Sequence, residues 1–106
     1  MSNNRDDRRY VGIFNDHEGG MTDSGKIIRD AWVFGLIPET ETCEGWMVQG
    51  IQTLWEKIDL EWEKYGFLVN NLPPELRKRF DRIQSDALVR AKKLGWDPDH
   101  ALDNEA

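Results

Sequence analysis

The sequence has little of what proteins use for covalent cross-linking, metal binding or membrane insertion. It contains one cysteine, Cys43, and two histidines among its 106 residues. A single cysteine excludes a disulfide within the chain and fits a reducing compartment. No apolar run approaches the roughly 20 residues that span a bilayer, and the charged beginning, "MSNNRDDRRY", lacks the apolar core of a secretory signal. We therefore expect a cytoplasmic protein without a membrane partner.

Positive charge is also scarce over the chain as a whole. There are 14 Lys and Arg residues against 20 Asp and Glu residues, which gives a formal net charge of −6. A protein with this charge has no general attraction to nucleic acid or to anionic membranes. Nucleic acid is therefore not the partner that the composition favours.

Tryptophan, by contrast, is plentiful. Each tryptophan can bury on the order of 150–250 Å², so a few of them supply much of the core of a short chain. The length fits one domain, which we place at 10–96. The charged ends, which are poor in apolar side chains, predict a disordered tail at 1–9 and an acidic tail at 97–106. The five tryptophans are Trp32, Trp46, Trp55, Trp62 and Trp96.

A first helix is predicted at about 23–35, where apolar residues recur on one face. Thr22, Asp23 or Ser24 can each accept a hydrogen bond from the free amides of its first turn. The segment "IIRDAWVF" is also rich in residues that suit a strand.

The clearest helical pattern runs from Met47 to Tyr65, where apolar residues recur every three or four positions. Thr42 is the expected N-cap of this helix, and Gly66 is the expected C′ glycine. The apolar face consists of Met47, Ile51, Leu54, Ile58, Trp62 and Tyr65.

A third helix is predicted at about 74–94. It opens with two prolines, which a first helical turn tolerates. Gly95 can take the left-handed conformation that ends a helix, which places Trp96 to pack back on Ala91. The apolar face consists of Leu76, Phe80, Ile83, Ala87, Ala91 and Leu94.

These patterns predict a mainly α fold, a small three-helix domain with an extended or short-strand N-terminal arm. Residues 44–65 contain five acids and two bases, whereas residues 74–94 contain three acids and seven bases. Because the loop between them is short, we expect these two helices to lie side by side as antiparallel neighbours. The arm, 10–14, is either a strand that pairs with 67–69 or an extended segment that lies on the helices.

The stretch "GMTDSGKI" resembles a phosphate-binding loop in its spacing. Gly20, Gly25 and Lys26 match the motif, but Ile27 stands where a hydroxyl should hold Mg²⁺. The supporting fold is a parallel sheet, which needs more strands than this chain can supply. We therefore interpret the stretch as a turn and a helix cap, and we predict no nucleotide cofactor.

Cys43 is the one candidate for thiol chemistry. The amides at the start of the second predicted helix would lower its pKa, whereas Glu41 and Glu44 would raise it. No base lies near it in sequence, and no acid, base and nucleophile lie close enough together to propose a reaction. A thiol-dependent enzyme or sulfur carrier is therefore an alternative function rather than the favoured one.

The two histidines, His17 and His100, each have acidic neighbours in the sequence. Structural metal sites normally show compact pairs of ligands, and this spacing does not. We predict no metal site.

The third predicted helix offers a different alternative, nucleic-acid binding. Four bases lie within about one and a half turns, and phosphate contacts need such clustering. The overall negative charge and the acids within the helix oppose this interpretation. The four bases are Arg77, Lys78, Arg79 and Arg82.

The favoured function is that of an accessory or regulatory domain that binds another protein. Trp46 and Trp96 lie at predicted helix ends, where aromatic side chains are often only partly buried and can anchor a partner. We predict a partner surface around "PETETCEGW", residues 38–46, that includes Cys43 and any exposed part of the two tryptophans.

Overall fold

A computed structural model describes residues 9–96 of the chain. Apart from Arg9, the two tails predicted at 1–9 and 97–106 lie outside this range. The described residues contain no strand, and their three α-helices confirm the mainly helical three-helix fold. None of these helices combines the length and the apolar character that crossing a membrane requires. The helices are α1 (Asp23–Val33), α2 (Val48–Glu63) and α3 (Pro74–Lys93), and two short 3-10 turns lie at Ile13–Asn15 and Val69–Asn71.

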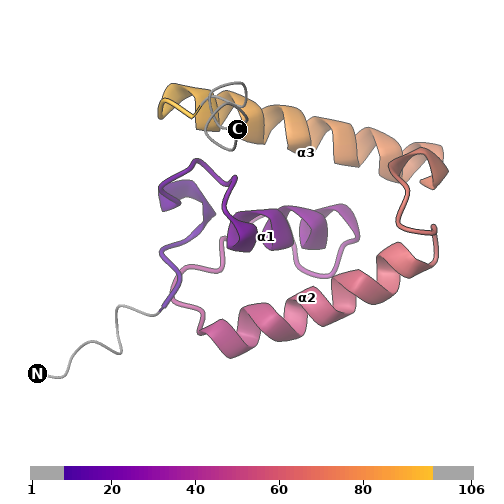
Figure 1. The fold of residues 1–106 in the computed structure, drawn as a ribbon, viewed down its shortest axis with the longest axis horizontal. Coiled ribbons are helices and arrows are strands. Elements are labelled where there is room, and N and C mark those ends of the chain that lie inside the picture. The colour runs from indigo at the N-terminus through magenta and orange to yellow at the C-terminus, as the bar shows by residue number, and fades with distance from the viewer. Residues whose placement is uncertain (1–8, 97–106) are drawn as a thin grey trace, which may run out of the picture.

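Helix α1 lies between α2 and α3 (Figure 1). α1 packs against both α2 and α3, and its buried residues face more than one side. The prediction that the second and third helices lie side by side is wrong. They meet through Trp62 and Phe80, whose ring centroids are 6.1 Å apart, and otherwise diverge. The reason is that α1 carries enough apolar surface to cover both neighbours.

α1 begins and ends with local hydrogen bonds; the start was predicted from the sequence, whereas the end, at Val33, lies two residues before the predicted one. Of the three possible caps, Thr22 is the one used, and its Oγ1 accepts a hydrogen bond from the Gly25 amide at 3.1 Å. At the other end Gly35 has a φ of 71°, and the Leu36 amide donates to the Ala31 carbonyl at 2.9 Å. This pair of features is a Schellman ending.

The predicted N-cap of the second helix is wrong, although the predicted glycine at its end is confirmed. α2 begins at Val48 with Met47 as an N-cap that makes no side-chain bond, so Thr42 is not its cap. The chain just before Met47 has a positive φ at Cys43, which a helix cannot contain. Gly66 takes the left-handed conformation with a φ of 63° at the C-terminal end, as predicted.

The end of the third helix is also confirmed. Gly95 has a φ of 93°, and the Trp96 amide donates to the Ala91 carbonyl at 3.0 Å. Three bases, Arg90, Lys92 and Lys93, lie in the last turn, where the helix dipole favours positive charge.

The N-terminal segment is irregular and does not pair with 67–69, so that strand prediction is wrong. Instead it runs alongside the chain that precedes α2. The Tyr10 amide donates to the Trp46 carbonyl at 2.8 Å, and the Gly45 amide donates to the Tyr10 carbonyl at 2.8 Å. The Ile13 amide donates to the Thr42 carbonyl at 3.1 Å, and the Ile13 side chain is completely buried in the core.

The core lies where α1 meets the other elements. It combines residues of the N-terminal segment, all three helices and the loop before α2, namely Ile13, Ile28, Ala31, Trp32, Val33, Cys43, Leu54, Ile58 and Ile83. Three apolar residues at the start and in the middle of α2 are only partly covered. The side chains of Met47, Val48 and Trp55 are 46%, 65% and 45% exposed. The apolar stripe of α2 is therefore wider than the surface that α1 covers.

Candidate functional site

Two adjoining pockets follow the seam between α1 and α2, and we call them together the α1–α2 groove. The first has a volume of about 450 Å³ and the second about 520 Å³. They share Asp23, Ile27 and Gln52 in their linings, so one pocket continues into the other. Pockets that hold ligands typically have volumes of about 300–1,000 Å³. Each half of the groove has the size of a binding site.

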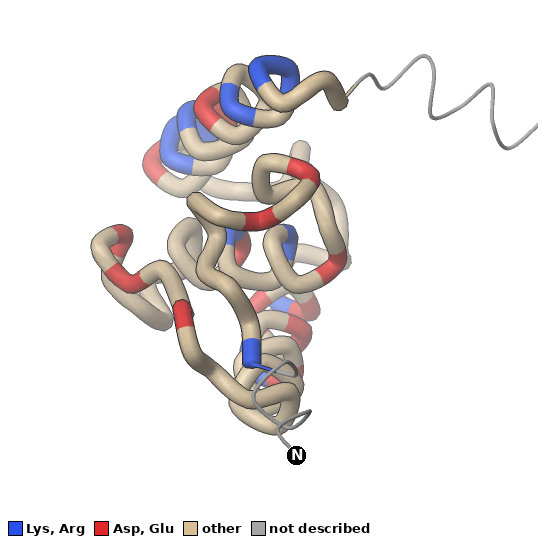
Figure 2. The backbone as a smooth tube through the Cα atoms, turned by 90° about the vertical axis from the view of Figure 1, so that its left-hand side faces the viewer, with Lys and Arg blue, Asp and Glu red and all other residues tan. Residues whose placement is uncertain are grey.

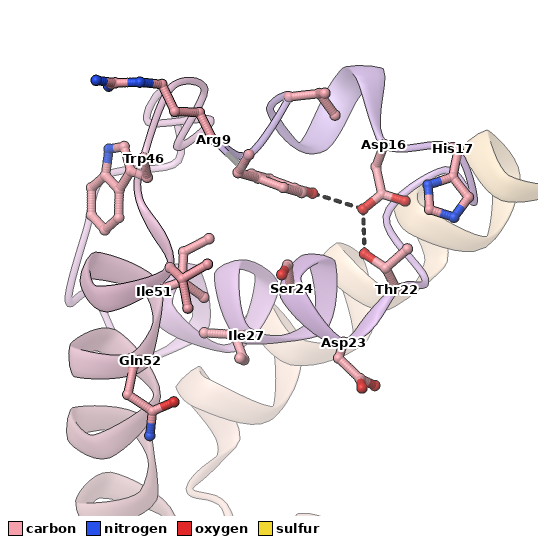
Figure 3. A pocket seen from close by; sticks show the side chains of 13 residues that line it. Arg9, Asp16, His17, Thr22, Asp23, Ser24, Ile27, Trp46, Ile51 and Gln52 are labelled. Carbon is pink, nitrogen blue, oxygen red and sulfur yellow. Dashed lines mark hydrogen bonds between the residues drawn. The ribbon is translucent and has the colours of Figure 1, made fainter. Parts of the chain in front are cut away.

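The first pocket lies where the N-terminal ends of α1 and α2 meet (Figure 3). Ile27 of α1 and Ile51 of α2 supply apolar surface, and Trp46 stands at one side. Trp46 lies against the first turns of α2, as shown by the 3.3 Å that would separate a Cβ added at Gly50 from the indole ring. Gly50 therefore makes room for the indole, which explains a glycine in the first turns of this helix.

A buried carboxylate forms the polar wall of the first pocket. Asp16 is only 2% exposed, and its Oδ2 accepts hydrogen bonds from the Tyr10 hydroxyl at 2.7 Å and from the Thr22 hydroxyl. Its Oδ1 accepts a bond from the Glu18 amide at 2.8 Å. Burial alone would raise the pKa of Asp16, but the hydrogen bonds from Thr22, Glu18, Tyr10 and Gly20 outweigh it and lower the pKa.

The same network fixes the tyrosine that covers this end of the pocket. Burial, followed by the hydrogen bond to Asp16 and its charge, raises the pKa of Tyr10 well above its usual value. The hydroxyl therefore stays protonated and donates to the carboxylate. Because Thr22 also caps α1, the network ties the N-terminal segment to the start of that helix.

The second pocket combines indole rings with carboxylates. Trp55 and Trp62 of α2 line it together with Asp30 of α1 and Asp59 of α2. The Trp62 Nε1–H donates to Asp30 Oδ2 at 3.1 Å. Burial raises the pKa of Asp30, and the bond from Trp62 opposes that effect only in part. The two carboxyl groups, of Asp30 and Asp59, thus border the indole rings of Trp55 and Trp62.

Of the residues predicted to bind a partner, Trp46 is the one that lines the groove. Trp96 is half-buried just beyond the end of α3 and lines neither pocket of the groove. Cys43 is completely buried, so a partner that approaches the folded protein does not reach it. The structure does not bring these three residues together into one surface.

The environment of Cys43 is opposite to that of a reactive thiol. α2 begins five residues later, so the helix amides that were expected to lower the pKa are not beside it. Burial, with a smaller contribution from the charge of Glu41, raises the pKa of the Cys43 thiol to about 12. The Cys43 amide also donates to Glu41 Oε2 at 2.9 Å, which holds the loop in place.

Three of the four bases proposed for nucleic-acid binding are engaged within the molecule. Arg77 Nε pairs with Asp81 at 3.1 Å, and Arg79 Nη1 donates to the Val33 carbonyl at 3.1 Å. Arg82 makes two bonds to the Glu39 carboxylate, at 3.0 and 2.8 Å. The bases do follow α3 as a group (Figure 2). Arg79 fastens α3 to the end of α1 and Arg82 fastens it to the loop after α1, whereas the pair of Arg77 with Asp81 lies within α3.

The glycines that resemble a phosphate-binding loop have a packing role. A Cβ on Gly25 would lie 2.5 Å from the Gly20 carbonyl oxygen, so loop and helix approach too closely for any side chain there. The Gly20 carbonyl accepts a bond from Arg29 Nε at 3.1 Å. The Gly25 amide, which a phosphate would need, is bound to Thr22.

The two histidines are not brought into a metal site by the described part of the chain. His17 is exposed, and its Nε2 lies 3.7 Å from Glu18 Oε2. His100 lies outside the described residues. Within 9–96, no group of three or more His, Cys, Asp or Glu side chains is placed to hold a metal ion.

Sequence reasoning missed most of this groove. Trp55 and Trp62 lie seven residues apart and therefore on one face of α2. We interpreted this pair of tryptophans as part of the core. The signal that was available was Asp59 between them, on the same side of the helix. Asp16 carried no signal, because its role depends on chain segments that meet only in the fold. Comparison of the chain with protein-family models, curated proteins and solved structures gives no match.

Proposed function

We propose that this chain is an accessory or regulatory protein-interaction domain that binds a segment of another protein in the α1–α2 groove. The observation that carries the proposal is the pair of adjoining pockets, whose lining includes Trp46, Trp55 and Trp62. Tryptophan is among the residues that most often anchor protein interfaces, because it buries a large area at a small cost in conformational entropy.

The exposed apolar residues around the groove support the same proposal. Val11 and Val48 line the first pocket and are 51% and 65% exposed, and Trp55 of the second pocket is 45% exposed. A contiguous apolar surface bordered by polar residues is typical of a site that a partner covers. Transfer of such surface out of water favours association by about 25 cal/mol per Å².

The two alternative functions have less support. Thiol chemistry needs an accessible thiolate, and Cys43 has neither the exposure nor the pKa for it. Nucleic-acid binding through α3 would require Arg77 and Arg82 to exchange their carboxylate partners for phosphates. We also propose a cytoplasmic location, with which the one free cysteine agrees.

A matched pair of variants tests the proposal. Gln52→Arg adds a longer side chain at a position that lines both pockets, whereas Gln49→Arg makes the same change on an exposed part of α2 outside them. Peptides would be selected from a random library on the wild-type protein and titrated by fluorescence polarisation. We expect Gln52→Arg to weaken their binding by about tenfold or more and Gln49→Arg to leave it within about twofold.

Two outcomes would overturn this proposal. One is that no selected peptide distinguishes Gln52→Arg from the wild-type protein. The other is that both variants weaken binding equally, which would place the binding surface elsewhere. Circular dichroism would confirm that both variants keep the helical content of the wild-type protein.

A further inference from the structure

The two halves of the α1–α2 groove offer different chemistry. In the first pocket Arg9 and Asp16 are already engaged, because Arg9 Nη1 donates to the Gly45 carbonyl at 3.1 Å and Asp16 is bound by Tyr10 and Thr22. Asp23 lies at the border, where it lines both pockets. The surface that remains available there is mainly apolar. It is formed by Val11, Ile27, Trp46, Val48 and Ile51.

In the second pocket negative charge is in excess. Its lining contains three carboxylates, Asp23, Asp30 and Asp59, against one ammonium group, Lys26. None of the salt bridges of the described residues joins Lys26 to these carboxylates. Asp30 accepts a hydrogen bond from Trp62, whereas Asp23 and Asp59 make no salt bridge within the described residues, so a cation that entered the pocket would find these two carboxylates available.

The indole rings of the second pocket favour the same kind of guest. The face of a tryptophan ring attracts a Lys or Arg side chain, and the attraction grows when water is excluded. Trp55 is 45% exposed, so one ring is accessible from outside. The net charge of −6 adds a long-range field that steers positive groups toward the protein.

We infer that the segment bound in the groove is a cationic, amphipathic stretch of another protein. It places an apolar side chain in the first pocket and a Lys or Arg side chain in the second. Ile51 lines the first pocket and Ile58 the second, and seven residues of α2 span about 10 Å. The two side chains of the partner are therefore about 10 Å apart, the spacing of positions i and i+7 on a helix. This inference rests on the proposed function of the groove.

The test uses the peptides that bind the wild-type protein and fail on Gln52→Arg, labelled with fluorescein. We expect them to share a Lys or Arg, and we expect its replacement by Gln to weaken binding by about tenfold. Asp59→Asn removes a carboxylate of the second pocket, and Glu56→Gln removes an exposed carboxylate of α2 outside it. Asp59→Asn should weaken binding of the parent peptide about fivefold or more, and Glu56→Gln should change its affinity by less than about twofold.

A double-mutant cycle decides whether the two groups meet. If the basic residue of the peptide contacts the pocket, Asp59→Asn has little further effect on the peptide in which that residue is Gln. If Asp59→Asn and the replacement of the basic residue of the peptide raise the dissociation constant by independent factors, the inference is overturned. Groove-binding peptides without a basic residue would overturn it as well, while leaving the proposed function in place.

A second copy of this chain is the other occupant that the test must separate, because α3 is basic. Sedimentation velocity of the wild-type protein is expected to give a monomer at all concentrations. A dimer that Asp59→Asn dissociates and Glu56→Gln does not would assign the groove to a second copy and overturn the inference. If no selected peptide responds to Gln52→Arg, the proposed function itself fails, which is a different result from either of these.

Discussion

Two aspartates of this protein lie in opposite surroundings: Asp16 is buried, and Asp30 is half-buried in the lining of the second pocket. Asp16 accepts hydrogen bonds from two hydroxyls and from backbone amides, so its ionised form is favoured and its pKa is lowered. Asp30 is held mainly by the Trp62 indole, and burial raises its pKa. Residues of the same type therefore affect stability in opposite ways.

We predict that Asp16→Asn destabilises the protein at pH 7 by about 1–3 kcal/mol, because an amide NH₂ would face hydrogen-bond donors. A pKa lowered in the folded state means that the carboxylate stabilises the fold above its ordinary value of 3.8. That stabilisation is lost as the pH falls through the lower folded pKa. Urea unfolding at a series of pH values should therefore show that the difference in unfolding free energy between Asp16→Asn and the wild-type protein shrinks in acid.

Asp30→Asn is the matched control for this prediction. Because the pKa of Asp30 is raised in the folded state, its ionised form opposes folding at neutral pH, and this penalty disappears as the pH falls below 3.8. The asparagine can still accept the bond from Trp62. We expect no loss of stability at pH 7, and a loss as large as that of Asp16→Asn would contradict the interpretation of both sites.

The buried thiol gives a second prediction for a single residue. Cys43 is 0% exposed and has a pKa of about 12, so its thiolate is scarce at pH 8. We expect a thiol reagent such as iodoacetamide to react with the folded protein at least about 100-fold more slowly than with the chain unfolded in urea. Similar rates in the two states would mean that the loop before α2 opens readily, and thiol chemistry would regain support.

Among the elements, α1 depends on a close approach to the loop that precedes it. A glycine inside a helix normally costs about 0.5–1 kcal/mol relative to alanine. At Gly25, however, an added Cβ would meet the Gly20 carbonyl oxygen at 2.5 Å. At Gly50 of α2 the nearest atom is Cε3 of Trp46 at 3.3 Å, which belongs to a half-buried side chain that can move.

We therefore predict that Gly25→Ala destabilises the protein by about 1–3 kcal/mol, despite the better helix propensity of alanine. Gly50→Ala should leave the stability within about 1 kcal/mol of the wild-type value. Urea unfolding of the two variants measures this contrast directly. If Gly25→Ala proved as stable as Gly50→Ala, the tight packing of the 20–25 turn would be refuted.

At the scale of the whole molecule, α1 is the element that holds the other two together. α3 is fastened to the α1 side by Arg29, which bonds to Gly20 and Gln84, and by the close approach of Gly19 to Ala91. α2 packs on α1 separately. α2 and α3 can therefore be loosened independently of each other.

Gly19→Ala tests this independence, because its Cβ would lie 2.5 Å from the Ala91 Cα. We expect hydrogen exchange to speed up more at the amides of α3 than at those of α2, since local opening releases the element whose contacts are strained. Gly95→Ala is the control for backbone strain, because Gly95 also has a positive φ, of 93°, but a Cβ there meets nothing within 4 Å. Its effect is expected to be confined to the last turn of α3. Equal acceleration of α2 and α3 by Gly19→Ala would mean that the three helices open as one unit.

The sequence by itself determined the number of helices and most of their ends. Gly66 and Gly95 could be assigned in advance, and the cap of α1 could be narrowed to three residues that include Thr22, because each acts through hydrogen bonds to residues a few positions away. The cap of α2 was wrongly placed at Thr42 because the loop before the helix is shaped by contacts with the distant segment at Tyr10.

Only the tertiary structure decided which helix is central and which apolar residues remain uncovered. Charge suggested that the second and third helices pair, but burying the apolar surface of α1 on more than one side outweighs attraction between exposed charges. The same packing leaves Trp55 beside Asp59 and Asp30 in the groove. A periodic pattern says which residues share a face, whereas the extent to which a neighbour covers that face depends on residues far away in the chain.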